Sequence, residues 1–358
     1  MLRIFLALLA AREWKCNCID IKSAFLQGET LDREVYLKPP AEAVDTGGKL
    51  WKLKKCVYGL NDAARAWYFT VRSELLKLGC VQLQVDPALF YWYQDDKLAG
   101  LFVIHVDDFL WGGTKEFEEH VINEIRSKFD VGKEADCIFK YVGIETEQSA
   151  VGITVKQKSY LDSVDSIPLS LGRASRKYDN LNTQEAEKLR SLVGQLNWLC
   201  TQSRPDACYD VLEISSNLKH PVVEDILKAN KCVKKLRNDE CFITFPPLGD
   251  PNNLRLVAFS DASHANLSDG VSSAGGFIVF LVNGENQCCP LAWGSKKIRR
   301  VVKSTLAAES LAMVEAVDVC YYLAHILSEI LFMNTKKVPI ECYVDNHSLW
   351  DNVHSTKM

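Results

Sequence analysis

The feature that most constrains the fold is a pair of adjacent aspartates inside a long apolar run. Residues 98–106 are largely apolar, Asp107 and Asp108 follow, and residues 109–113 resume the apolar pattern. Two apolar segments joined by acidic residues are typical of a buried hairpin with a tight turn. Adjacent carboxylates repel each other, and a bound cation is the usual reason for such a pair. The sequence therefore predicts a hairpin that holds both acids at the edge of a sheet.

A third carboxylate has a matching position earlier in the chain. Residues 16–26 predict a strand followed by the start of a helix, with Asp20 at the end of the strand. Mg²⁺ in proteins is usually held by a few carboxylates together with substrate phosphates. Two such ions, about 3.5–4 Å apart, suit in-line displacement at phosphorus. Asp20, Asp107 and Asp108 thus predict a two-metal site for nucleotidyl transfer; the alternative is that they belong to unrelated acidic turns.

The last third of the chain predicts a separate domain with acids of its own. Residues 254–261 form an apolar strand pattern that ends at Asp261. Residues 275–285 predict a hairpin, in which Asn283-Gly284 is a strong signal for a tight turn.

A helix and a final strand complete this pattern. The helix begins near Ser304, carries Glu309 and continues with apolar residues at helical spacing, namely Leu311, Val314, Ala316, Val319 and Leu323. A strand over residues 339–344 then ends at Asp345. The order of elements predicts that Asp261, Glu309 and Asp345 come together. The alternatives are a surface helix acid for Glu309 and a turn former for Asp345.

The composition indicates a globular protein with hydrophobic cores. The chain has 358 residues, of which 47% are hydrophobic, and a formal net charge of −4, which argues against a uniformly basic nucleic-acid binder. Phosphate contacts would therefore need local positive charge. Candidates are Lys52, Lys54 and Lys55, or the group Lys228, Lys231, Lys234, Lys235 and Arg237. The second group has amphipathic helical spacing, and its alternative is a solvated helix face.

The cysteines and the N-terminal segment bear on the compartment. Thirteen cysteines are scattered without zinc-ligand spacing, so we expect reduced thiols in a cytosolic or nuclear setting. Residues 1–11 combine one positive charge with a short apolar core, as signal peptides do. The segment is too short to span a membrane, and we expect a helix that precedes Asp20 rather than a signal peptide.

Several motifs resemble, in order, those of reverse transcriptases of Ty1/copia retrotransposons. Residues 20–28, Asp-Ile-Lys-Ser-Ala-Phe-Leu-Gln-Gly, resemble the first palm motif of that family. The motifs that follow are Val35-Tyr-Leu-Lys-Pro-Pro, Leu53-Lys-Lys-Cys-Val-Tyr-Gly-Leu-Asn-Asp-Ala-Ala-Arg-Ala-Trp-Tyr, Val106-Asp-Asp, Tyr141-Val-Gly-Ile-Glu and Ser203-Arg-Pro-Asp. The resemblance covers nearly the whole chain. It implies an RNA-directed DNA polymerase whose metal ligands are Asp20, Asp107 and Asp108.

The same resemblance implies roles for residues around these acids. Phe25 would lie under the incoming sugar and exclude a 2′-hydroxyl, with an ordinary core aromatic as the alternative. Residues that would contact the template or the incoming nucleotide are Tyr58, Gly59, Leu60, Arg65 and His105. For Arg65 the alternative is a solvated helix residue, and His105 stands where the family usually has tyrosine or phenylalanine. Tyr141 and Gly143 would support the primer end.

The C-terminal pattern resembles a second enzyme of the same retrotransposons. Trp293-Gly-Ser-Lys-Lys before the helix, together with the order of strands, is similar to the ribonuclease H domain that follows the polymerase. This resemblance implies that Asp261, Glu309 and Asp345 bind two Mg²⁺ ions that serve hydrolysis of RNA.

The predicted fold class is α+β and α/β. It comprises a reverse transcriptase palm with truncated fingers at 1–150, a mostly helical thumb or connection region at 151–250, and a ribonuclease H-like mixed α/β domain at 251–358. We expect the fingers to be short because only nineteen residues precede Asp20, and the last domain to lack its C-terminal end. Residues 245–253, with their prolines and glycine, are the best boundary between domains.

The function implied is RNA-directed DNA synthesis coupled to removal of RNA from RNA/DNA hybrids. Each site would use two Mg²⁺ ions, with Mn²⁺ as an alternative. The expected partners are an RNA template, a DNA primer, RNA/DNA hybrid and dNTPs, and no membrane is expected. A link to DNA integration is inferred only by association with such retrotransposons. We expect a cytoplasmic location, with a virus-like particle or the nucleus as alternatives. Two other hypotheses are a catalytically inactive remnant that at most binds nucleic acid and, from the N-terminal apolar run, a secreted globular protein.

Overall fold

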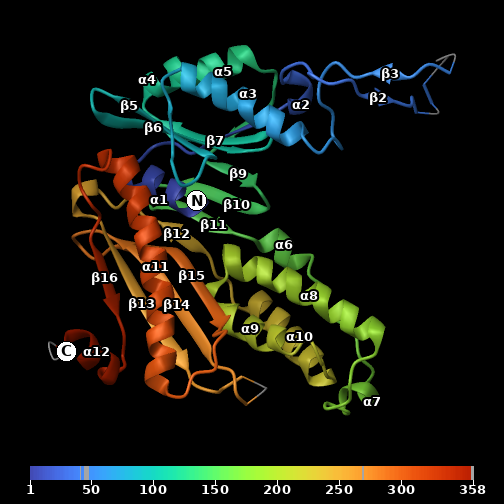
Figure 1. Ribbon diagram of the computed structural model, residues 1–358, viewed down its shortest axis with the longest axis vertical. Helices are drawn as coiled ribbons and strands as arrows, with labels where there is room; N and C mark the ends of the chain where they lie inside the picture. The colour runs from blue at the N-terminus through green and yellow to red at the C-terminus, as the bar shows by residue number, and fades with distance from the viewer. Residues whose placement is uncertain (41, 44–47, 268–269, 356–358) are drawn as a thin grey trace. The chain divides into compact units, whose positions relative to one another are not determined.

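The structure, a computed structural model, describes residues 1–40, 42–43, 48–267 and 270–355 and divides into two compact units (Figure 1). The first unit is Trp14–Cys137 together with Met1, and the second is Leu2–Glu13 together with Ile138–Met358. Both units combine helices with sheets, so the predicted mixed α and β class is confirmed. The predicted division into three parts at 150 and 250 remains a prediction.

A six-stranded antiparallel sheet, in the order β4-β5-β6-β7-β1-β8, lies at the centre of the first unit. Its strands are β1 (Asn17–Ile21), β4 (Val81–Gln82), β5 (Leu89–Gln94), β6 (Lys97–His105), β7 (Asp108–Gly113) and β8 (Val131–Asp136). The apolar run around the two aspartates forms β6 and β7, so the predicted hairpin is present. The strand predicted to end near Asp20 is β1.

Helices and a short hairpin complete the first unit. They are α2 (Ala24–Gln27), β2 (Tyr36–Leu37), β3 (Trp51–Lys52), α3 (Ala63–Lys77), α4 (Lys115–Phe117), the π-helical turn η1 (Glu118–Ile122) and α5 (Asn123–Lys128). Large aromatic side chains fill the core between the helices and the sheet. Trp67 of α3, Phe102 of β6, Phe109 of β7 and Phe117 of α4 are all at most 1% exposed.

The N-terminal segment is a helix, α1 (Leu2–Ala11), as the sequence predicts. All residues from Ile4 to Ala10 are buried, because α1 packs against β11 (Gly152–Lys156), β12 (Ile243–Phe245) and β15 (Cys288–Lys297). The helix therefore belongs to the second unit. Its neighbour in sequence, β1, belongs to the first, a separation that the sequence did not predict.

The middle of the chain forms a small sheet and a group of helices. The sheet has the order β12-β11-β10-β9, with β9 (Ile138–Tyr141) and β10 (Ile144–Ser149). The helices are α6 (Lys158–Asp162), α7 (Leu171–Ala174), α8 (Thr183–Gln202), the 3₁₀ turn η2 (Pro205–Ala207), α9 (Cys208–Ser216) and α10 (Val223–Asn238). Apolar faces of α8, α9 and α10 share one buried core. The amphipathic spacing of the basic group at 228–237 thus belongs to α10.

A second four-stranded sheet occupies the C-terminal part of the second unit, in the order β15-β14-β13-β16. Its remaining elements are the 3₁₀ turn η3 (Pro251–Asn253), β13 (Arg255–Ser263), β14 (Ala274–Val282), α11 (Thr305–Phe332), β16 (Ile340–Tyr343) and α12 (His347–His354). Strand β16 runs parallel to β13, whereas the other pairs are antiparallel. Figure 1 shows α11 lying across this sheet, and its contacts are with β13, β14 and β16.

Two details of this region differ from the sequence prediction. The turn between β14 and β15 spans residues 283–287 instead of the Asn283-Gly284 dipeptide alone, because the Asn283 side chain accepts hydrogen bonds from the backbone N–H groups of Glu285 and Gln287. Val314 was predicted on the buried face of the helix, yet it is 55% exposed. The buried face includes the predicted Ala316 and Leu323 together with Ala308, Ala312 and Cys320. Helix α11 is long and apolar enough to cross a membrane by length and composition alone, and it packs against β13, β14 and β16.

Candidate active sites

The first acidic site, Asp20, Asp107 and Asp108, is built by the pairing of β1 with β7. Asp20 and Asp108 are direct cross-strand partners. Asp107 lies in the turn that joins β6 to β7, and its backbone carbonyl accepts a hydrogen bond of 2.9 Å from the N–H of Ile21. The three predicted acids are therefore neighbours at one end of the sheet, where antiparallel pairing places them.

The turn of the first acidic site has an unusual backbone. Val106 has a φ of 56°, in the left-handed region that a β-branched residue rarely adopts. The indole N–H of Trp67 donates a 2.7 Å hydrogen bond to the Val106 carbonyl and so holds the turn against α3. Strained backbone of this kind persists only where surrounding contacts fix it. The role of Trp67 was not predicted, although this residue belongs to the motif at 53–68.

Two predicted nucleotide-binding residues approach Asp107. The Tyr58 hydroxyl donates a 3.0 Å hydrogen bond to Asp107 Oδ2, and the Tyr58 ring lies 4.4 Å from the ring of Phe25, centroid to centroid. Tyr58 is 61% exposed whereas Phe25 is 7% exposed. Phe25 therefore belongs to the core and, through its contact with Tyr58, also borders the surface beside the acids.

The other predicted template- or nucleotide-binding residues are Gly59, Leu60, Arg65 and His105. Gly59 has a φ of 97°, which favours glycine, and Leu60 packs against the core. Arg65 is exposed on α3, where its guanidinium lies 5.5 Å from the Phe69 ring. His105 pairs with Asp108 on the last rung of the β6–β7 hairpin.

Burial and the repulsion between carboxylates both affect the pKa of Asp108 in the first acidic site. Burial raises the pKa of Asp108 above its usual range, the charges of Asp107 and Asp20 raise it further, and His105 opposes them. Carboxylates arranged so that one resists ionisation form a site that favours a cation. Gly132 on β8 leaves room for the Asp20 carboxylate, because a Cβ on residue 132 would lie 2.4 Å from Asp20 Oδ2. No local sequence pattern indicates this role of Gly132, since the contact joins segments that are distant in the chain.

The predicted primer-support residues lie in the second unit. Tyr141 ends β9 and is buried, and Gly143 follows in the turn to β10 with a φ of 77°. The roles inferred for Tyr141 and Gly143 remain predictions.

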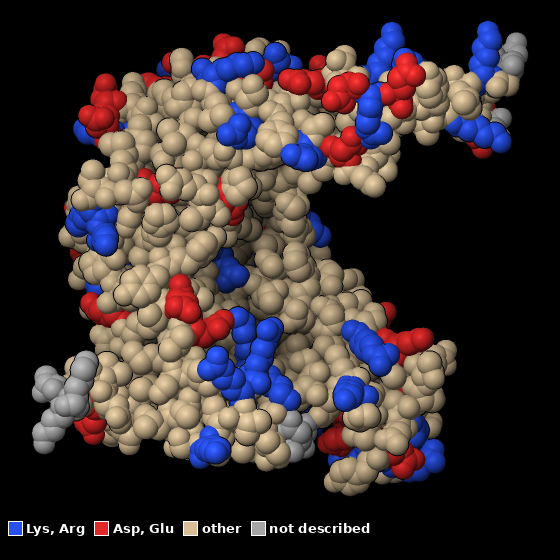
Figure 2. All heavy atoms as spheres, viewed as in Figure 1, with Lys and Arg blue, Asp and Glu red and all other residues tan. Residues whose placement is uncertain are grey.

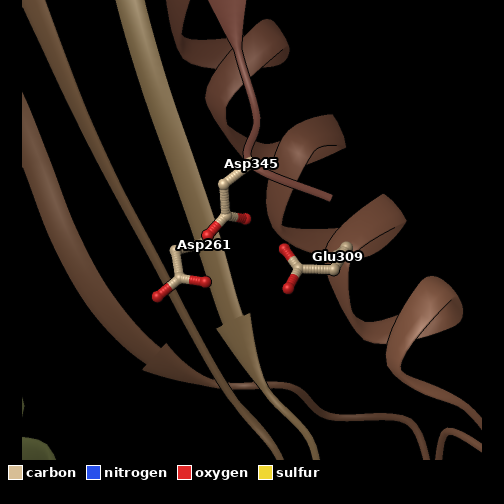
Figure 3. Close-up of side chains that lie close together, drawn as sticks. All are labelled: Asp261, Glu309 and Asp345. Carbon is tan, nitrogen blue, oxygen red and sulfur yellow. The ribbon is translucent and has the colours of Figure 1, made fainter. Parts of the chain in front are cut away.

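The second acidic site, Asp261, Glu309 and Asp345, is the tighter cluster. One carboxylate oxygen from each residue lies within 4.8 Å of the other two (Figure 3). Parallel pairing places Phe259 beside Tyr343, so Asp261 and Asp345, each two residues farther on, reach the same end of the sheet. Glu309 comes from α11, which begins where the Ser304 side chain accepts a hydrogen bond from the Ala307 N–H. The structure thus brings together the three residues that the sequence predicts.

Glu309 carries the strongest sign that this site is built for a cation. It is 6% exposed, and its buried Oε2 has no hydrogen-bond donor among the described residues. Burial raises the pKa of Glu309, and the charges of Asp261 and Asp345 raise it further, against a backbone hydrogen bond at Ala262. An orphaned buried oxygen that faces two further carboxylates fits a hard divalent ion, which takes oxygen ligands.

Comparison with known proteins shows a family likeness in the part of the chain that contains the first acidic site. Residues 1–169 match the family described as "Reverse transcriptase (RNA-dependent DNA polymerase)". The chain is 29% identical over 99% of its length to the retrovirus-related Pol polyprotein from transposon RE1 of Arabidopsis thaliana, and 29% identical over 92% to that from transposon RE2. The chain is a relative of copia-type retrotransposon Pol proteins.

The chain spans only about a quarter of the length of those relatives. It covers 24% and 23% of the length of the RE1 and RE2 polyproteins. It is also 24% identical, over 79% of its length, to a putative transposon Ty5-1 protein of Saccharomyces cerevisiae, of which it covers 94%. A solved prototype foamy virus protease–reverse transcriptase matches 93% of the chain and 43% of its own at 12% identity, with a TM-score of 0.20.

Proposed function

We propose that this chain is an RNA-directed DNA polymerase with an attached ribonuclease H. The observation that carries the polymerase is the ladder position of Asp20 opposite Asp108, with Asp107 in the adjoining turn, inside a region of the reverse transcriptase family. The observation that supports the nuclease is the convergence of Asp261, Glu309 and Asp345.

Each acidic site would hold its divalent ions through its own three residues. Mg²⁺ is the expected ion, with Mn²⁺ as the alternative. When bound, such ions neutralise charge on the reacting phosphate and lower the pKa of the attacking hydroxyl or water. The protein's part is positioning and electrostatics, because strands, the β6–β7 turn and α11 hold the acids in place before substrate binds.

The residues around the first acidic site would act on the nucleotide. The buried ring of Phe25 would pack against the incoming sugar and leave no room for a 2′-hydroxyl. The exposed face of Tyr58 would meet the same nucleotide, and the positive φ of Gly59 would let the backbone approach it closely. The substrates would be a DNA primer on an RNA template and dNTPs, and the second acidic site would act on RNA/DNA hybrid.

The thiol chemistry supports a reducing compartment as the place of action. None of the thirteen cysteines forms a disulfide, as expected for cytosolic proteins. We propose the cytoplasm, including a particle assembled there.

Primer extension tests the polymerase directly. The purified chain is incubated with a labelled DNA primer on an RNA template, dNTPs and Mg²⁺, beside Asp107→Asn as the matched control. Extension by the parent alone supports the proposal, whereas a folded parent that binds the duplex but never extends it would indicate a non-catalytic remnant. Cleavage of a labelled hybrid, with Asp261→Asn as control, tests the nuclease in the same way.

A further inference from the structure

A cavity of about 220 Å³ lies among α6, α8 and α10 in the second unit. Its apolar walls are Leu161 of α6, Leu199 of α8 and Leu236 of α10, all at most 8% exposed. Figure 2 shows Lys and Arg side chains gathered where Figure 1 draws α11 and the ends of β14 and β15. The residues that line the cavity come from other elements, so the cavity is separate from that surface charge. We call it the α6–α10 cavity.

A buried amide group that lacks an acceptor lines the α6–α10 cavity. Gln157 is 4% exposed, and its Oε1 accepts a 2.8 Å hydrogen bond from the Ser203 hydroxyl. Its Nε2 has no acceptor among the described residues. A buried donor that stays unpaired costs the free energy of removing it from water, and native proteins rarely contain one. The protein thus lacks the acceptor that this donor needs, and an oxygen atom of a ligand would supply it.

Arg204, which follows Ser203, brings further donors to the same cavity. It is 4% exposed. Its guanidinium donates to the two carboxylate oxygens of Asp206 at 2.9 and 2.8 Å and to the Leu236 carbonyl at 2.8 Å. A guanidinium has five N–H groups, so two remain beyond these three bonds. The planar fork of such groups matches the two oxygens of a carboxylate.

Positive charge exceeds negative charge around the α6–α10 cavity. The lining contains four cations and two acids, namely Lys156, Lys158, Arg204, Arg237, Asp162 and Glu240. Asp206, the partner of Arg204, brings the acids to three and still leaves one positive charge in excess. Lys158 and Glu240 form only a long ion pair of 3.9 Å, and both side chains are exposed. The charge of the cavity therefore favours an anion over a cation.

We propose that the α6–α10 cavity binds a small amphiphilic carboxylate, whose oxygens accept hydrogen bonds from Gln157 Nε2 and Arg204 and whose apolar part packs on the leucines. The volume is below the roughly 300–1,000 Å³ of sites for drug-sized ligands, so the ligand is small. The leucine walls favour a molecule with apolar atoms over inorganic phosphate, because burial of polar groups without partners is costly. Both donors are nearly buried, so a small free molecule reaches them whereas a nucleic acid on the surface does not.

Saturation-transfer NMR of benzoate with the full chain tests this site, with two molecules as competitors. Benzamide has the same ring without the charge, and inorganic phosphate has the charge without the ring. Hydrogen bonds to an ionised acceptor are roughly twice as strong as neutral ones, so we expect benzoate to bind roughly tenfold more tightly than either competitor. Absence of benzoate binding, or binding of phosphate as tight as that of benzoate, would overturn the proposal.

Gln157→Glu is the sharpest variant, because it replaces the unpaired N–H group with an oxygen and keeps an oxygen for the Ser203 hydroxyl. We expect it to weaken benzoate binding roughly tenfold or more, since a carboxylate would face a carboxylate. Gln184→Glu makes the same change at an exposed position on α8 and should bind benzoate as the parent does.

A second variant tests the apolar side of the cavity and keeps the test decisive if Gln157→Glu does not fold. Leu161→Trp fills the space beside the leucine walls and leaves both donors in place, so we expect it to abolish benzoate binding. Circular dichroism checks the fold of each variant. Benzoate affinity that is unchanged in a folded cavity variant, or reduced equally by Gln184→Glu, would show that benzoate does not bind in the α6–α10 cavity.

Discussion

Gly132 limits what can stand beside Asp20, since an added Cβ would lie 2.4 Å from Asp20 Oδ2 and 3.3 Å from the Asp20 carbonyl. In Gly132→Ala the Asp20 carboxylate must rotate away from its neighbours. Displacement of a reacting group by about 1 Å can cost about 100-fold in rate, so we expect primer extension to fall at least tenfold. The fold should persist, as judged by circular dichroism. Gly172→Ala, whose Cβ meets nothing within 4 Å, is the matched control and should retain full extension.

The Tyr58 hydroxyl occupies an oxygen of Asp107 that a cation would need. Tyr58→Phe removes this donor and keeps the ring against Phe25. A typical hydrogen bond contributes about 0.5–1.5 kcal/mol, so we expect Mn²⁺ to bind the first acidic site roughly two- to tenfold more tightly. Calorimetric titration of a chain that also carries Glu309→Gln isolates this site. Unchanged or weaker affinity would contradict the competition, and Tyr178→Phe, at an 87% exposed position, controls for loss of a phenol.

At this scale the sequence predicted the acids and missed the residues that position them. Asp107 and Asp108 stand out because carboxylates interrupt an apolar run, a signal that is local. Gly132 and Trp67 act through contacts with Asp20 and Val106 that join distant segments. Periodicity and residue type alone do not report such contacts.

The β6–β7 hairpin depends on a pair of glycines that make room for one aromatic ring. Gly100 and Gly113 face each other across the two strands, and a Cβ on Gly100 would lie 2.2 Å from the Phe117 ring. Overpacking of a core costs about 1–3 kcal/mol. We expect Gly100→Ala to lower the free energy of unfolding by at least that amount in urea titrations of intrinsic fluorescence.

The control for that substitution is a glycine in open space. Gly194 lies within α8, and an added Cβ meets nothing within 4 Å. Alanine favours a helix over glycine by up to about 1 kcal/mol, so Gly194→Ala should be neutral or stabilising. Equal stability of Gly100→Ala and the parent would contradict the packing argument.

Elements with strong local patterns were predictable, and their partners were less so. The hairpin over 98–113 and the helix from Ser304 follow from the spacing of apolar residues. The five-residue turn after β14 depends on the Asn283 side chain, which overrides the dipeptide signal. The assignment of α1 to the second unit depends on tertiary packing. A helix pattern shows an apolar face but not which sheet covers it.

At the scale of the whole molecule, each unit carries one cluster of acids that repel one another. Burial and neighbouring charge raise the pKa of Asp108 in the first unit and of Glu309 in the second. An acid whose pKa is higher in the folded than in the unfolded state contributes most to stability at low pH, and this contribution is lost as the pH rises through both values. Without a cation, each cluster therefore lowers stability near neutral pH.

Removal of the charge on Glu309 should relieve that cost. We expect Glu309→Gln to raise the melting temperature of the metal-free chain at pH 7 and to leave it unchanged at pH 4, below the usual glutamate pKa of 4.5. Mn²⁺ at about 100 times its Kd would stabilise the parent by about 2.7 kcal/mol, and the variant by less because a ligand is lost. Scanning calorimetry at both pH values, with and without Mn²⁺, measures these effects. Glu187→Gln on the exposed face of α8 should match the parent in every condition. Stabilisation by Mn²⁺ that is equal in the parent and in Glu309→Gln would show that the second acidic site does not bind the ion through Glu309.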